Sequence, residues 1–126
     1  MASGTGRTEA GEQAFYALMA LAEPPTAGFC DNDVTAIGLL CAAREAGLSV
    51  PQDLSVVGFD DIPFASYMYP ALTTIAQPKF EMGKQAMQMA LALMPAHALP
   101  AAEVSDIVGK GTLIVRSSSG PWMARR

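Results

Sequence analysis

The feature that most constrains the fold of this chain is the alternation of two residue patterns. Short continuous apolar runs, bounded by turn-forming residues, alternate with longer segments whose apolar residues recur every three or four positions. Such runs are typical of buried strands, and their alternation with helices favours an α/β fold, with a parallel sheet flanked by helices. The expected strands are 26–30, 54–59, 72–76 and 111–116, and the expected helices are 11–23, 33–46, 62–67 and 80–94, with a loop or hairpin over 95–109.

The predicted helix over 33–46 is apolar on almost every side, and after its first residue its polar residues are Thr35, Arg44 and Glu45. An ordinary surface helix has a single apolar stripe. This helix is therefore either buried on every side or covered on its outer face by another subunit, and we favour the subunit contact.

Charge and cysteine content narrow the class of protein. The net charge is −4 and the basic residues are scattered, so we expect no nucleic-acid surface on this chain itself. The spacing of Cys30 and Cys41 fits no zinc or redox motif, and both lie in apolar runs typical of buried, reduced thiols.

No apolar run reaches the ~20 residues that span a bilayer, and the first ten residues do not resemble a signal peptide. We expect a cytoplasmic protein without membrane contacts.

Two polar clusters follow predicted strands. Asp31, Asn32 and Asp33 come directly after the first strand, and Asp60 and Asp61 come directly after the second. Ligands of parallel α/β sheets bind beyond the carboxyl ends of the strands. Carboxylate and amide groups at that edge suit the hydroxyls of a sugar or nucleoside.

The same residues allow other interpretations. The run DNDVT matches the Asp-x-Asp-x-Thr pattern of haloacid-dehalogenase-like phosphatases, with Asp31 as the nucleophile, and a receiver-like metal pocket or simple caps and turns are further alternatives. The phosphatase interpretation is weakened because no Lys lies between Asp33 and Asp60, and Val34 stands where that family usually has Gly. We predict a protein that is not an enzyme, with no catalytic residue, metal ligand or cofactor.

Two stretches carry a family resemblance, PPTAGFCDNDVTAIGLLCAAREAGLSVPQDLSVVGFDDIPFASYMYPALTTIAQPKFEMGKQAM and GTLIVRSSSGP. Over residues 11–118 the chain resembles the C-terminal part of the effector-binding domain of LacI/GalR-family transcriptional regulators. The resemblance implies a partial periplasmic-binding-protein-like (type I) lobe. It assigns 1–10 to a flexible lead-in, 11–77 to the C-lobe, 78–108 to a segment similar to the N-lobe crossover, 109–118 to a strand returning to the C-lobe and 119–126 to a tail.

The resemblance also implies a function, namely sensing a small-molecule effector, a sugar before other classes, within a homodimeric transcriptional repressor. The ligand-binding residues that it implies are Asn32, Asp33, Asp60 and Gln77. The dimer-interface residues that it implies are Ile37, Leu40, Cys41, Tyr67 and Met68.

The sequence lacks the helix-turn-helix head, the hinge helix and the N-lobe of that family. We therefore expect a fragment or the product of a truncated gene, in which DNA is reached only through a head that is missing here. The alternatives are a stand-alone periplasmic-type sugar-binding module, the phosphatase described above, and a non-functional remnant.

Overall fold

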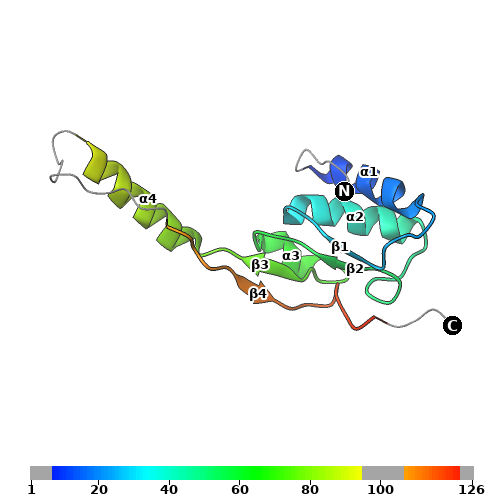
Figure 1. The fold of residues 1–126 in the computed structure, drawn as a ribbon. Coiled ribbons are helices and arrows are strands. Elements are labelled where there is room, and N and C mark those ends of the chain that lie inside the picture. The colour runs from blue at the N-terminus through cyan, green and yellow to red at the C-terminus, as the bar shows by residue number, and fades with distance from the viewer. Residues whose placement is uncertain (1–6, 95–106, 123–126) are drawn as a thin grey trace. The chain divides into compact units, whose positions relative to one another are not determined.

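The structure, a computed structural model, describes residues 7–94 and 107–122, in which helices and strands alternate (Figure 1). The elements are α1 (Thr8–Met19), β1 (Ala27–Phe29), α2 (Asp33–Glu45), β2 (Ser55–Val57), α3 (Pro63–Tyr67), β3 (Thr74–Ala76), α4 (Lys79–Leu93) and β4 (Thr112–Ile114). Every predicted strand and helix is present, although each strand is only three residues long. Most of the predicted loop or hairpin over 95–109 lies outside the described residues.

The chain divides into two compact units, Met1–Ala76 together with Leu113–Arg126, and Gln77–Thr112. The first unit holds the parallel strands. β1 and β2 pair in parallel with Gly28 opposite Val56, and a parallel bridge joins Val57 to Thr73 just before β3. β3 pairs with β4, so the described strands form two two-stranded sheets, β1–β2 and β3–β4, which isolated parallel bridges connect into one surface. The predicted parallel sheet is therefore confirmed for the strands that carry the polar clusters.

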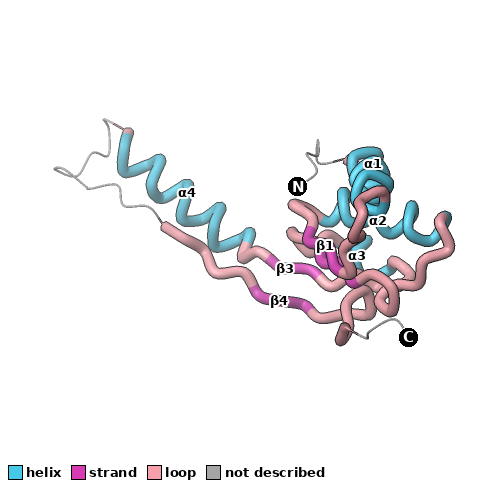
Figure 2. Tube along the Cα trace, turned by 45° about the vertical axis from the view of Figure 1, so that its right-hand side comes forward, coloured by secondary structure: helices cyan, strands magenta, loops and turns pink. Residues whose placement is uncertain are grey.

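The core of the first unit lies between the sheet and α2, and α1 packs on α2 (Figure 2). Gly28 of β1 faces Leu39 of α2, and Val56, Leu72 and Ala36 have no exposed surface. Burying a valine or leucine side chain contributes about 1.5–3 kcal/mol, so these contacts fix α2 on the sheet.

Helices α1 and α2 approach each other backbone to backbone. A Cβ atom at Gly38 would lie 1.9 Å from the carbonyl oxygen of Thr8, and one at Gly11 would lie 2.0 Å from that of Thr35. Only glycine fits at both positions, because no real Cβ contact is that short. α2 is thus covered by the sheet on one side and by α1 on another, and this burial within the chain accounts for most of its apolar residues.

Helix α1 begins earlier than predicted, because its first turn packs on α2. The helix begins at Thr8, ahead of the predicted start at Gly11, and Ala10 is buried. The assignment of all of residues 1–10 to a flexible lead-in was therefore wrong for Thr8, Glu9 and Ala10, since tertiary packing extends the helix past its apolar pattern.

The second unit contains α4, whose bounds agree with the helix predicted over 80–94. None of its residues is buried, and its apolar side chains are exposed, among them Phe80, Met87 and Leu93. None of the described helices combines the length and the apolar character needed to cross a lipid bilayer.

Candidate functional site at the carboxyl ends of the strands

The two predicted polar clusters lie side by side at one edge of the sheet. The backbone N–H of Cys30 donates to the carbonyl oxygen of Val57 at 2.8 Å, and that of Asp33 donates to Phe59 at 2.8 Å. These bonds hold the loop after β1 against the loop after β2, as the parallel pairing of the two strands requires.

Asn32 caps the first turn of α2. Its side-chain oxygen accepts a hydrogen bond of 2.8 Å from the backbone N–H of Thr35. Asparagine is a preferred N-cap residue because it satisfies a helix N–H that has no partner within the helix. The cap fixes the half-buried Asn32 side chain at the strand edge, and it leaves the amide nitrogen outside the cap.

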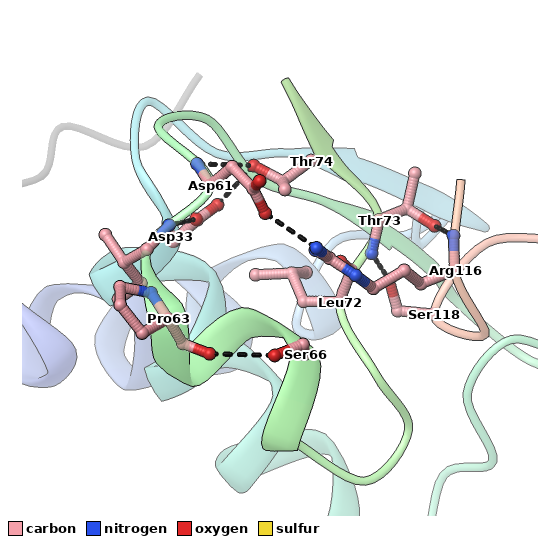
Figure 3. Close-up of polar contacts among 10 residues, drawn as sticks. Asp33, Asp61, Pro63, Ser66, Leu72, Thr73, Thr74, Arg116 and Ser118 are labelled. Carbon is pink, nitrogen blue, oxygen red and sulfur yellow. Dashed lines mark hydrogen bonds and ion pairs between the residues drawn. The ribbon is translucent and has the colours of Figure 1, made fainter. Parts of the chain in front are cut away.

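Asp33 was predicted to bind ligand, but its carboxylate is enclosed by the protein. It has no exposed surface, and Oδ1 accepts a hydrogen bond from Thr74 Oγ1 while Oδ2 accepts one of 2.8 Å from the backbone N–H of Ile62 (Figure 3). Gly58 allows this approach, because a Cβ atom there would lie 2.3 Å from Asp33 Oδ1. A buried carboxylate needs such partners. In this structure Asp33 joins the start of α2 to β3 and to the turn after β2, which is a structural role.

Asp60 and Asp61 form a tight turn in an unusual backbone conformation. Their φ angles are 112° and 50°, in the left-handed region that favours glycine. The Asp60 backbone N–H donates to Ile75 at 3.0 Å, and the Asp61 backbone N–H donates to Thr74 Oγ1 at 3.4 Å. The turn is therefore fixed to β3 on its inner side.

Arg116 completes the cluster, and its role was missed from the sequence, where it counted only as one scattered basic residue. Its guanidinium contacts Asp61 Oδ1 at 2.7 Å through one nitrogen and donates to the carbonyl oxygen of Leu72 at 2.8 Å through another (Figure 3). Its backbone N–H donates to Thr73 Oγ1 at 2.9 Å. Arg116 lies just past β4, so no local sequence signal connects it with Asp61.

Gln77, the remaining predicted ligand residue, directly follows β3 and begins the second compact unit. Its carbonyl oxygen accepts a hydrogen bond of 2.8 Å from the backbone N–H of Lys79. Gln77 thus follows the carboxyl end of the third strand, as Asn32 and Asp60 follow the first two.

The residues predicted at the dimer interface differ widely in exposure. Leu40 is only 4% exposed and belongs to the core, because it points from α2 into the first unit. Ile37, Cys41 and Met68 are half-buried, whereas Tyr67 is 83% exposed. In this structure Leu40 is a core residue, and Tyr67 is the most accessible of the five.

The opposite end of the sheet holds a small hollow of about 120 Å³. Its lining includes Ala27 and Ser55, the first residues of β1 and β2, together with Asp53 and Trp122. Ligand pockets usually measure about 300–1,000 Å³. This hollow is separate from the polar cluster and smaller than a usual ligand pocket.

The prediction of buried thiols is confirmed for Cys30, whereas Cys41 is only half-buried. Both cysteines are free. Burial raises the pKa of the Cys30 thiol from 9.0 to about 11, and the nearby carboxylates of Asp31 and Asp33 add to the rise. Within residues 7–94 and 107–122, no three His, Cys, Asp or Glu side chains are grouped so that they could hold a metal ion.

Comparison with known proteins shows the family to which this chain belongs. Residues 2–119 match the model of the periplasmic binding protein-like domain. The chain is 48% identical over 91 residues to the HTH-type transcriptional repressor CytR of Escherichia coli (strain K12), and the match covers 72% of this chain and 27% of that repressor. It is 49% identical over 88 residues to the HTH-type transcriptional repressor PurR of Escherichia fergusonii, with 70% and 26% covered. The chain thus spans about a quarter of the length of these relatives.

A solved structure agrees with this assignment. The LacI family transcriptional regulator from Enterococcus faecium with bound ribose matches with a TM-score of 0.78 at 33% identity, covering 93% of this chain and 42% of that chain. The likeness confirms the predicted fold class and the family resemblance. The chain belongs to the periplasmic binding protein-like domain family and is homologous to the effector-binding portion of LacI-family transcriptional regulators.

Proposed function

We propose that this chain is the effector-sensing portion of a cytoplasmic LacI-type transcriptional repressor and that it performs no catalysis. The observation that carries the proposal is the cluster of polar side chains in the loops that follow β1 and β2, at the edge where parallel α/β sheets bind ligands. The relatives named CytR and PurR are transcriptional repressors, which supports the same role here.

The proposed effector is a sugar or another molecule rich in hydroxyl groups. Asp60 would accept hydrogen bonds from ligand hydroxyls, while the amides of Asn32 and Gln77 can both donate and accept. Asp33 would hold the loops of the site in place rather than contact the ligand, because both of its carboxylate oxygens already accept hydrogen bonds within the chain. The Enterococcus faecium regulator, which holds ribose, makes ribose the first ligand to test.

The lobe assignment belongs to the same proposal. Residues 11–77 and 109–118 would form part of the C-lobe, and 78–108 would belong to the N-lobe crossover. The division into two compact units, with Gln77–Thr112 separate from the rest, supports this assignment.

The proposed partner is a second copy of the chain. Ile37 and Cys41 on α2, together with Tyr67 and Met68 at the end of α3, would form the contact, and the high exposure of Tyr67 supports it. Effector binding would shift the population of dimer geometries, and DNA would be reached through another part of the full protein.

The test is a ribose titration of the chain labelled with ¹⁵N, with amide chemical shifts as the readout. We expect saturable shifts in the loops that contain Asn32 and Asp60, with millimolar affinity because the chain covers only part of the ribose-bound relative. Asp60→Asn is expected to weaken the binding, and Glu45→Gln, on the exposed end of α2, is the control that should not.

Two outcomes would contradict the proposal. Equal affinity in wild type and Asp60→Asn would exclude Asp60 as a ligand contact. Magnesium-dependent hydrolysis of a phosphate ester that is abolished by Asp31→Asn would instead identify an enzyme.

A further inference from the structure

The turn at Asp60 and Asp61 holds a conformation that its own residues disfavour. Neither residue is glycine, yet their φ angles are 112° and 50°. Non-glycine residues pay a conformational cost in this region, and they keep such angles only where the surroundings impose them. Some group outside the turn must therefore hold it in place.

Besides the backbone bond from Asp60 to Ile75, three side chains among the described residues restrain this turn (Figure 3). Asp33 Oδ2 accepts the N–H of Ile62 at 2.8 Å, immediately after the turn. Thr74 Oγ1 accepts the N–H of Asp61 at 3.4 Å, which is a long bond. The contact between Arg116 and Asp61 Oδ1 is the shortest of the three at 2.7 Å, and it joins the guanidinium directly to the Asp61 side chain.

Arg116 is itself fixed in place. The second guanidinium nitrogen donates to the carbonyl oxygen of Leu72 at 2.8 Å, and the backbone N–H donates to Thr73 Oγ1 at 2.9 Å. The side chains of Arg116 and Asp61 are 19% and 28% exposed, so the ion pair is largely removed from solvent. A guanidinium can meet two acceptors at once in fixed geometry, which a lysine ammonium on a flexible stem cannot do as well.

We propose that Arg116 is a positioning residue for effector binding, whose ion pair with Asp61 holds the turn in the conformation that sets Asp60 at the strand edge. This inference rests on the proposed function, because it takes Asp60 to be a ligand contact. Arg116 does not itself touch the ligand. It acts through Asp61, and it makes the affinity for effector depend on the segment just past β4.

The experiment measures the backbone conformation and the binding separately. On the full chain labelled with ¹³C and ¹⁵N, the three-bond HN–Hα and one-bond Cα–Hα couplings of Asp60 and Asp61 report the sign of φ without any ligand. In Arg116→Met these couplings are expected to move to values typical of negative φ, and affinity for ribose is expected to fall about tenfold. Arg116→Lys is expected to recover part of both effects, because it keeps the charge.

Controls separate this role from general stability. Arg44→Met removes an exposed arginine at the end of α2 and should change neither readout. Asp61→Asn keeps the size of the side chain and removes its charge, so it breaks the same ion pair. It should therefore change the couplings and the ribose affinity in the same way as Arg116→Met, and it replaces that variant as the test if Arg116→Met does not fold. Amide shifts of α1 and α2 that match wild type would show that the first unit remains folded.

The outcomes distinguish this inference from the proposed function. Wild-type couplings in both Arg116→Met and Asp61→Asn would overturn the positioning role, whatever ribose does. Altered couplings with unchanged ribose affinity would also overturn it, because the turn would then not serve binding. If wild type does not bind ribose at all, the ligand assignment fails, while the couplings still decide whether Arg116 holds the turn.

Discussion

The hydroxyl of Thr74 donates a hydrogen bond to Asp33 Oδ1, and neither residue has any exposed surface. This bond joins the first residue of α2 to the first residue of β3, which lie 41 positions apart in the sequence. It makes a residue at the predicted ligand edge part of the core.

Asp33→Ala is expected to lower the free energy of unfolding by about 3 kcal/mol, because it leaves the buried hydroxyl of Thr74 and the part-buried N–H of Ile62 without their acceptor. Urea unfolding followed by circular dichroism measures the change. The control is Asp31→Ala at an exposed position, which should stay within about 0.5 kcal/mol of wild type. Equal effects of the two variants would show that the buried carboxylate contributes nothing to stability.

Gly38→Ala is expected to destabilise the first unit by about 2–3 kcal/mol or more, because the added methyl group would lie 1.9 Å from the backbone oxygen of Thr8 and would push α1 off α2. The matched control is Gly83→Ala in α4, where a Cβ atom would have nothing within 4 Å. That variant should instead raise helicity slightly, since alanine favours helices by about 1 kcal/mol. Unchanged stability in Gly38→Ala would mean that the two helices are not packed so closely in solution.

Thr35→Val is expected to stabilise the chain by about 1 kcal/mol. The Thr35 hydroxyl is buried and has no hydrogen-bond partner among the described residues, so replacing it with a methyl group removes an unpaired polar atom without changing the shape. Thr35→Ser is the control, because it keeps the hydroxyl and loses the methyl group, and it should destabilise. A loss of stability in the valine variant would indicate that the hydroxyl has a partner in solution.

The rate of alkylation with iodoacetamide should report the burial of the Cys30 thiol. The pKa of Cys30 is raised to about 11, so at pH 8 it should react more slowly in the native chain than after unfolding in urea, measured in a Cys41→Ser background. Because the folded pKa lies above the ordinary 9.0, this thiol contributes stability that is complete below about pH 9 and is lost as the pH rises toward 11. Cys30→Ala should lack that part of the pH dependence. Native and unfolded rates that agree would contradict the burial of Cys30.

Most of the architecture could be predicted from apolar spacing. The helix predicted over 33–46 is α2, Asp33–Glu45, and the one predicted over 80–94 is α4, Lys79–Leu93, because periodic apolar residues and polar or proline residues at the ends are local signals. The start of α1 at Thr8 could not be predicted in the same way. It depends on the contact with Gly38, and the residues near Thr8 carry no sequence signal of a contact with a distant helix.

The candidate site was predictable in its place but not in its internal contacts. Parallel strands end at a common edge, so the loops containing Asn32 and Asp60 had to lie close together. The enclosure of Asp33 depends on Thr74, on Ile62 and on the missing side chain of Gly58, and the restraint on Asp61 depends on Arg116, which is 55 positions away. Such pairings follow from the assembled sheet rather than from spacing along the chain.

The crossing of α1 and α2 through Gly11 and Gly38 has a consequence for how this protein can change by mutation. Elsewhere in the core a larger residue can be accommodated when a neighbour becomes smaller, so pairs of substitutions can preserve the packed volume. At this crossing both residues already have the smallest possible side chain, and the nearest atoms are backbone atoms that no substitution removes. Neither glycine can therefore be rescued by a compensating change at the other, and the two positions are expected to remain invariant among functional variants even though neither contacts a ligand.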